Sequence, residues 1–184
     1  MKTKALVLIG ILIIAFAAMV APVMAATTAT ITGNPDKTIT VTVTGGITNW
    51  ALAQGLNTDS TNVKLTVESN SPGWVVAAKD ALDGSKPSAG KMVDYSTDTE
   101  TYNTLALGSE VVIGGATSAT HYAGSEITLS GSDQTIVTGD SASTAAGTFT
   151  DTAVTVKQTV AITDSVLPTN HVYRIIVTMT GTTP

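Results

Sequence analysis

The feature that most constrains this chain is an alternation of apolar and polar residues that leads into a turn and a tryptophan. The segment 63–68, VKLTVE, alternates with a period of two, which places its apolar side chains on one face of a β-strand. The segment 69–73, SNSPG, has the composition of a turn, and an apolar strand resumes at Trp74. We interpret 61–82 as a hairpin that places the indole in a β-sandwich core, with one turn of helix over 77–82.

The same pattern recurs along the chain, most clearly at 37–44, KTITVTVT, where threonine and β-branched apolar residues alternate. No segment after the first 25 residues has a helical stripe. The predicted fold is therefore all-β, an antiparallel β-sandwich or jelly roll. The other predicted strands cover residues 47–52, 91–95, 105–113, 126–130, 134–138, 153–162 and 171–180.

Two details of pairing and regularity are also predicted. Segments 126–130 and 134–138 flank Gly131-Ser132-Asp133, which favours a short hairpin. The alternation in 153–162 slips near Lys157, which indicates a β-bulge or a change of face. The polar segment 54–60 is predicted as turn.

Residues 1–25 have the pattern of a secretory signal peptide. Lys2 and Lys4 precede an apolar run over 5–21, and small residues follow Pro22 in the segment 23–26. The run is shorter than the roughly 20 residues of a membrane-spanning helix, which argues against a retained anchor. A pilin-type leader, cleaved before the run, is the other alternative. We expect cleavage after Ala25 or Ala26, a single domain over 26–184, secretion to the cell surface, and no membrane insertion afterwards.

Charge and cysteine content exclude several classes of function. Charged residues make up 12% of the 184 residues, about half of the usual share of roughly 25%. Without Lys2 and Lys4, seven Lys and Arg face 14 Asp and Glu, a net charge of −7. Such an acidic surface does not suit nucleic acid or anionic lipid. With no cysteine, disulfides, thiolate zinc sites, a cysteine nucleophile and a lipoprotein anchor are all impossible.

Acidic loops provide the candidate metal site. Asp94, Asp98 and Glu100 lie close together in sequence, and calcium prefers six to eight oxygen ligands. The loops 94–103 and 131–147 are therefore candidate calcium- or glycan-binding segments. The alternative is a solvated acidic surface that keeps the protein soluble, and by that interpretation no cofactor is required.

The aromatic and histidine residues are the other candidates for binding and catalysis. Trp74 is predicted in the core because apolar residues follow it, whereas Trp50 has polar neighbours and is the candidate ligand or interaction residue. His121 and His171 are far apart in sequence and have no acidic neighbour at metal-ligand spacing. No nucleophile-elbow motif is present. The chain is therefore predicted not to be an enzyme, with a secreted hydrolase as the rival interpretation.

Three segments together carry a resemblance to known surface proteins. They are NVKLTVESNSPGWVVAAKDAL at 62–82, GKMVDY at 90–95 and VKQTVAITDSVLPTNHVYRIIVTMTGT at 156–182. This combination resembles the WxL-type wall-associated domains and the TasA/camelysin-type fibre proteins, which are secreted β-sandwich proteins. No metalloprotease motif is present, so the peptidase activity of the camelysin name is not carried over.

The resemblance implies an envelope, matrix or fibre component, whose partners are other envelope proteins or copies of itself. In some fibre proteins of the second group, an N-terminal strand of one subunit completes the sheet of the next, because an open sheet edge offers main-chain pairing. The segment 26–32, ATTATIT, could act as such a strand, although pairing within its own domain is the simpler expectation. The predicted function is a secreted, non-catalytic structural or adhesive surface protein, with a calcium- or glycan-binding module as the alternative.

Overall fold

The structure is a computed structural model that describes residues 32, 33, 35–117, 122–139 and 147–184, without the side chains of 147–151. The chain divides into two units, Met1–Pro35 and Asp36–Pro184, and the fold described below is that of the second. The predicted signal peptide, its cleavage site, residues 26–31 and His121 lie outside the described residues.

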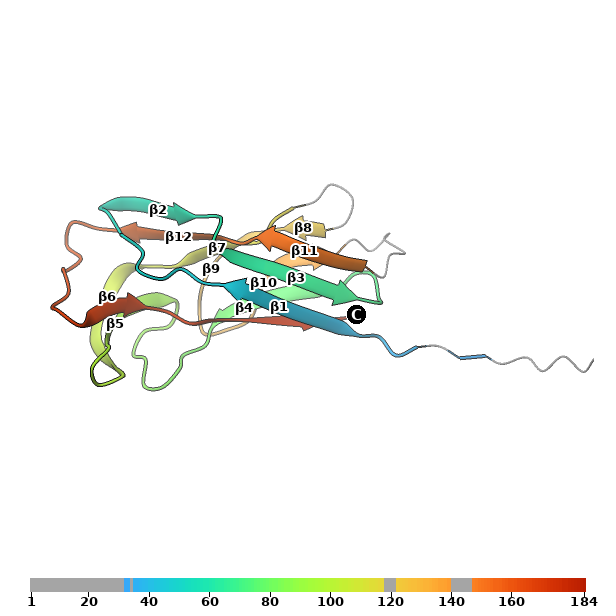
Figure 1. Cartoon of the computed structure of the whole chain (residues 1–184), viewed down its shortest axis with the longest axis horizontal. Coiled ribbons are helices and arrows are strands. Elements are labelled where there is room, and N and C mark those ends of the chain that lie inside the picture. The colour runs from blue at the N-terminus through green and yellow to red at the C-terminus, as the bar shows by residue number, and fades with distance from the viewer. Residues whose placement is uncertain (1–31, 34, 118–121, 140–146) are drawn as a thin grey trace, which may run out of the picture. The chain divides into compact units, whose positions relative to one another are not determined.

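The described part of the chain is all-β, and every strand pairing in it is antiparallel, which confirms the all-β and antiparallel part of the prediction (Figure 1). In this part of the chain no helix is long and apolar enough to cross a membrane. The strands are β1 (Ile39–Gly45), β2 (Gly55–Asp59), β3 (Val63–Ser69), β4 (Val75–Asp80), β5 (Lys91–Ser96), β6 (Thr101–Glu110), β7 (Val112–Gly114), β8 (Tyr122–Gly124), β9 (Glu126–Thr128), β10 (Gln134–Gly139), β11 (Gly147–Ala153), β12 (Thr155–Val160), β13 (His171–Arg174) and β14 (Val177–Thr182).

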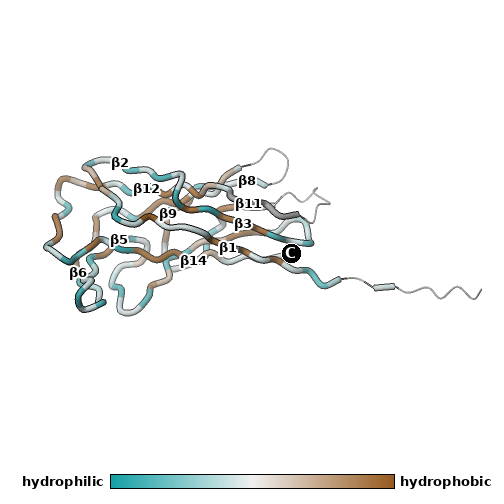
Figure 2. Tube along the Cα trace, in the orientation of Figure 1, coloured by the Kyte–Doolittle hydropathy of each residue, from teal (hydrophilic) through white to brown (hydrophobic). Residues whose placement is uncertain are grey.

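The strands form four sheets whose apolar faces share one core. Their orders are β1-β3-β11, β14-β4-β10-β8, β2-β12-β7-β9 and β13-β5-β6. In Figure 2 the hydrophobic colour runs along β3 and β14. All four sheets contribute buried residues to one cluster, which includes Leu65, Val76, Leu107 and Ile113. The periodicity of two therefore predicted the buried faces of these strands correctly.

Trp74 lies in this core, as predicted. Its side chain is 3% exposed, and its ring centroid is 6.4 Å from that of Tyr122. The indole packs on the backbone of Gly139, whose N–H donates to the Trp74 carbonyl at 2.7 Å. The large ring fits there because residue 139 has no side chain.

The predicted hairpin over 61–82 is wrong, although both of its strands exist. β3 pairs with β1 and β11, whereas β4 pairs with β10 and β14, so the turn at 70–73 carries the chain from one sheet to another. The predicted helical turn over 77–82 is also wrong, because β4 continues to Asp80. Its alanines pack between neighbouring strands, and Ala78 is fully buried in the core.

Other local predictions fail for the same reason. β9 pairs with β7 and β10 with β4 and β8, so residues 126–138 are not a hairpin. The predicted strand 171–180 divides into β13 and β14, which belong to different sheets. The predicted strand at 47–52 is irregular, and the predicted turn 54–60 contains β2, whose partner is the distant strand β12.

The bulge predicted near Lys157 is absent, because β12 pairs with β2 and β7 in an unbroken register. The alternation is intact if Gln158 is counted with the inward-facing residues, and this side chain is 0% exposed. Its Nε2 donates to the carbonyl oxygens of Ser109 and Thr159 at 3.2 and 2.8 Å. The irregular pairing lies instead in β11, between Phe149 and Thr152.

Candidate functional site

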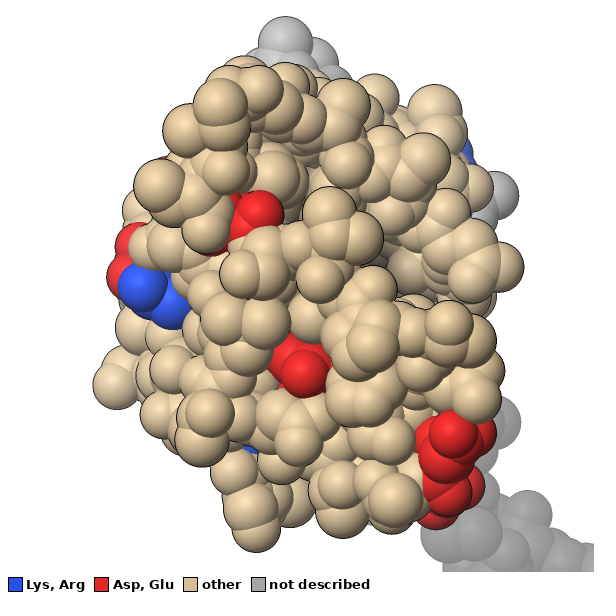
Figure 3. Space-filling model, turned by 90° about the vertical axis from the view of Figure 1, so that its left-hand side faces the viewer, with Lys and Arg blue, Asp and Glu red and all other residues tan. Residues whose placement is uncertain are grey.

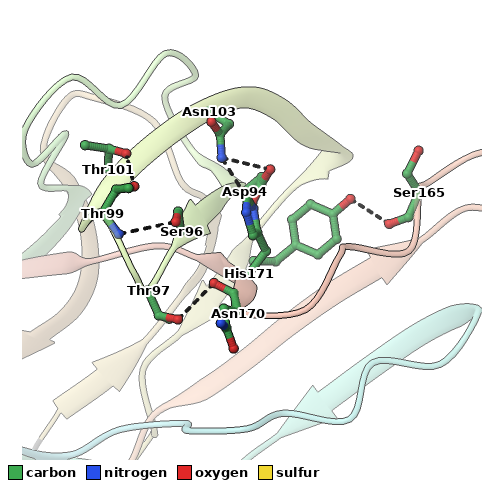
Figure 4. Close-up of polar contacts among 10 residues, drawn as sticks. Asp94, Ser96, Thr97, Thr99, Thr101, Asn103, Ser165, Asn170 and His171 are labelled. Carbon is green, nitrogen blue, oxygen red and sulfur yellow. Dashed lines mark hydrogen bonds and ion pairs between the residues drawn. The ribbon is translucent and has the colours of Figure 1, made fainter.

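The candidate site is the polar cluster around the turn between β5 and β6, at the side of β13 (Figure 4). It coincides with the loop 94–103, which the sequence singled out. Within the sheet β13-β5-β6, His171 lies opposite Ser96 and Tyr173 lies opposite Asp94. Cross-strand partners share a face, so one face of this sheet presents the polar side chains of β5 and β13 together.

The centre of the cluster is a carboxylate that contacts an imidazole and an amide. Asp94 Oδ1 lies 2.7 Å from His171 Nδ1, and Asp94 Oδ2 accepts a hydrogen bond from Asn103 Nδ2 at 3.1 Å. The Asp94 side chain is 8% exposed and that of His171 is 25% exposed. A buried carboxylate requires such partners, because an unpaired charge away from water is costly.

A second set of contacts joins the β5–β6 turn to the end of the β12–β13 connection. The N–H and hydroxyl of Thr97 both donate to the carbonyl oxygen of Asn170, at 2.9 and 2.8 Å. Asn170 Nδ2 donates to Asp98 Oδ2 at 2.9 Å. Asn170 has a φ of 63°, a left-handed conformation that asparagine tolerates better than most residues. These contacts hold the two loops together.

The predicted calcium ligands do not converge in this arrangement. Both oxygens of Asp94 contact side chains, Asp98 contacts Asn170, and Glu100 is exposed at the tip of the turn with a φ of 53°. Among the described residues, no three His, Asp or Glu side chains are grouped so that they could hold a metal ion. Calcium binding at this loop stays a prediction.

The opposite face of the same sheet carries a cluster of tyrosine and arginine. Arg174 lies 4.2 Å above the ring centroid of Tyr95, and Tyr95 packs edge-on against Tyr102 at 5.0 Å. The Tyr102 hydroxyl donates to Asp83 Oδ1 at 2.8 Å, and Arg174 pairs with the other oxygen of Asp83 at 3.4 Å. Burial and this hydrogen bond to a carboxylate raise the pKa of Tyr102 well above its usual range. The guanidinium and the two rings together form a half-buried surface.

The remaining candidate residues lie apart from this cluster. Trp50, the predicted interaction residue, is half-buried in the irregular segment between β1 and β2. Asp133, in the second candidate loop, pairs with Lys79 at 3.2 Å, and residues 140–146 of that loop lie outside the described residues.

In this cluster the Asp94 carboxylate orients the His171 imidazole. A carboxylate at Nδ1 fixes the orientation of an imidazole, which is one part of a catalytic triad. Within the described ranges, however, no serine or threonine hydroxyl is hydrogen-bonded to Nε2 of His171. Among the described residues, the geometry therefore provides an oriented imidazole but no hydroxyl bonded to it.

Sequence reasoning missed the contact between Asp94 and His171, because 77 positions separate them. One signal was available: Asp94 interrupts the apolar strand KMVDY, and an acidic residue at such a position requires a partner. Comparison with protein families, with curated proteins and with solved structures finds no match for this chain. The site is thus described from its own geometry alone.

Proposed function

We propose that this chain is a secreted, non-catalytic structural or adhesive protein of the cell surface or extracellular matrix. Its domain is a single antiparallel β-sandwich or jelly roll, held at the surface by contacts with other proteins. One observation carries the proposal. The connection 161–170, between β12 and β13, exposes Ile162 by 82% and Val166 by 96%.

Polar contacts fix this connection in place. Asp164 accepts hydrogen bonds from the backbone N–H of Gly108 at 2.9 Å and of Ala161 at 2.7 Å. The Tyr173 hydroxyl donates to the Ser165 carbonyl at 2.8 Å. A loop that is already ordered loses little conformational entropy when a partner binds, so its apolar side chains are well placed for a contact.

The surroundings favour an apolar contact over an electrostatic one. Leu56 of β2, Leu105 of β6 and Val172 of β13 are also exposed, by 66%, 39% and 42%. Figure 3 shows the end of the molecule that lies at the left of Figure 1, where acidic side chains are separated by uncharged surface. Exposed apolar side chains on such a surface are typical of protein interaction sites.

The test replaces the two loop residues together, as Ile162→Ser and Val166→Ser. Each fully buried apolar side chain contributes about 1.5–3 kcal/mol, so binding should weaken at least tenfold. The readout is the fraction of processed protein retained in the envelope of its own cells. Val43→Ser, at a residue of β1 that is 43% exposed, is the matched control and should bind like the wild type. Unchanged retention of the double variant would refute the proposal.

The proposal extends to fibre formation through the N-terminal strand. Within the described ranges, β1, β11, β14 and β8 lie at sheet edges, where unpaired main-chain groups can accept another strand. Removal of residues 26–35 should then abolish filaments in electron micrographs and shift the protein to monomer on a sizing column. Circular dichroism of the shortened chain controls for folding. Filaments that survive the deletion would exclude this mode of assembly.

A glycan-binding module is the second candidate, and the β5–β6 turn favours it. Thr99 and Thr101 are exposed there, with their hydroxyls 2.7 Å apart, and the rings of Tyr95 and Tyr102 lie on the same sheet. Hydroxyls together with aromatic rings suit sugar binding. Binding to a glycan array that is lost in Thr99→Val with Thr101→Val, and kept in the double loop variant above, would favour this function over adhesion by the loop.

A further inference from the structure

A buried pair of opposite charges lies away from the candidate site, where β4 ends. Asp80 is the last residue of β4, and Lys86 lies in the connection 81–90 that follows. The Nζ of Lys86 contacts Oδ2 of Asp80, and both side chains are 0% exposed. Asp80 also accepts backbone hydrogen bonds, from Gly90 to Oδ2 at 2.8 Å and from Leu82 to Oδ1 at 3.1 Å.

The surrounding connection is packed closely enough to exclude water from the pair. The Asp80 N–H donates to the Ser130 carbonyl at 2.9 Å. A Cβ at Gly90 would lie 2.1 Å from the Leu129 carbonyl oxygen, so the chain passes there only because the residue is glycine. Gly90 also has a φ of 75°, which glycine adopts without strain.

The ammonium of Lys86 is under-satisfied in this setting. It carries three donors, and Asp80 is the only acceptor for them among the described residues. Burial of a charged group without a full set of partners is unfavourable. A secondary amide has a single N–H and no charge, so it suits the same space better than the ion pair does.

We propose that Lys86 and Asp80 condense to an intramolecular isopeptide bond. A proton first passes from Nζ to the carboxylate, which gives an amine and a carboxylic acid. The Nζ lone pair then attacks Cγ, and the N–Cγ bond forms. A proton from nitrogen passes to the departing hydroxyl, the Cγ–O bond breaks, and one water leaves. The step balances without an oxidant or a further reactant.

The structure supports this step in two ways. The backbone N–H of Leu82 donates to Oδ1 and that of Gly90 to Oδ2, so the oxygen that becomes the oxyanion of the tetrahedral intermediate already has one backbone donor. The site also holds the amine against the carboxyl in a fixed geometry, which replaces a bimolecular encounter. Because the product closes a ring over residues 80–86, it would covalently fix a connection in a chain that has no cysteine.

Two other Lys–acid pairs provide internal controls. In Lys79–Asp133 the side chains are 36% and 51% exposed, and in Lys157–Glu126 they are 29% and 52% exposed. Water solvates these pairs, so we expect them to remain ion pairs. The proposed bond is therefore specific to the buried pair.

The test is mass spectrometry of the folded, processed protein after denaturation. Trypsin cuts after Lys79 and Lys91, and the resulting peptide 80–91, DALDGSKPSAGK, contains both reacting residues. The expected result is a peptide lighter by one water, with no backbone fragments from cleavage between residues 80 and 86. A peptide of full mass would overturn the proposal.

One side reaction gives the same mass and must be separated. Asp83-Gly84, in the same peptide, can form a succinimide with loss of one water. A succinimide opens in mild alkali, and backbone fragments from cleavage between residues 80 and 82 are still detected in its spectrum. The isopeptide bond resists alkali, and those fragments are absent from its spectrum. A deficit that alkali removes would therefore also overturn the proposal.

Lys86→Arg is the matched variant, because it keeps the positive charge and lacks the amine. The 80–91 peptide of Lys86→Arg should have its full mass. The control Lys79→Arg should still give a peptide lighter by one water, with the link between residues 80 and 86. A deficit that persists in Lys86→Arg would place the lost water elsewhere. Because the wild-type measurement decides the matter alone, poor folding of a variant does not weaken the test.

Discussion

The contact between Trp74 and Gly139 provides the sharpest test of the core. A Cβ on residue 139 would lie 2.5 Å from both Nε1 and Cε2 of the indole and 2.8 Å from Cδ1. Real Cβ atoms do not approach ring atoms this closely, so in Gly139→Ala either the indole or β10 must move. The Gly139 N–H bond to the Trp74 carbonyl, at 2.7 Å, opposes movement of the strand.

The cost of this change follows from overpacking. Extra methyl groups in a well-packed core destabilise by about 1–3 kcal/mol. For a domain of this size each kcal/mol lowers Tm by about 2–4 °C, so we expect a loss of about 2–12 °C. Thr138→Ala, at the exposed neighbouring position of β10, is the control and should change Tm little.

Thermal melts and fluorescence measure the two consequences separately. In a Trp50→Phe background the emission reports on Trp74 alone, and it should shift to the red if the methyl group expels the indole. Combining Gly139→Ala with Trp74→Phe removes part of the clash, so the two changes together should cost less than their sum. If Gly139→Ala melts like the wild type with unchanged emission, the proposed packing of Trp74 is refuted.

Three further predictions concern polar contacts and strain. The first is a double-mutant cycle with Asp94→Asn and His171→Phe, measured by urea unfolding. It should give a coupling free energy between the two residues of about 1–3 kcal/mol, because either change alone leaves a polar partner unmatched. Additive effects would show that the contact contributes nothing. Because the folded pKa of Tyr102 is raised by burial and by its hydrogen bond to Asp83, its contribution is complete below the unfolded pKa of about 10 and is lost as pH rises above it. The Tm of the wild type should therefore fall more steeply above that pH than the Tm of Tyr102→Phe, and parallel curves would contradict this. Leu82→Gly should raise the free energy of unfolding in urea by up to about 1 kcal/mol, because Leu82 has a φ of 50°, which only glycine adopts freely. A lower free energy of unfolding would mean that the packing of the Leu82 side chain outweighs the strain.

The periodicity of the sequence predicted which face of a strand is buried, but not which strand lies beside it. Leu65 and Val67 are in the core as the alternation requires. The partner of β3 is nevertheless β1 or β11, and not the next strand in sequence. Alternation indicates only which side chains are exposed to water. When several sheets share one core, many different strand pairings are consistent with the same alternation.

The contacts of the segment 94–103 were not predicted from the sequence. This polar segment includes the β5–β6 turn, but Asp94 contacts His171 instead of Asp98 and Glu100. The buried Asp80 was missed for a related reason, since its partner Lys86 lies in a connection whose composition suggests full exposure. In each case the available signal was an acidic residue in or at the end of a largely apolar strand.

These buried polar contacts have a common consequence for how the chain specifies its fold. Outer positions on several strands are threonine, as in β1, and a threonine face hardly distinguishes one register from another. The contacts of Asp94 with His171, and of Gln158 with Ser109, form only in the observed alignment. A shift of β13 against β5 by two residues would keep each side chain on its face of the sheet, but it would leave the Asp94 carboxylate without its imidazole. We infer that these polar residues contribute less to stability than to the choice of one register, because the hydrogen bonds of Asp94 and of the Gln158 Nε2 form in the observed alignment.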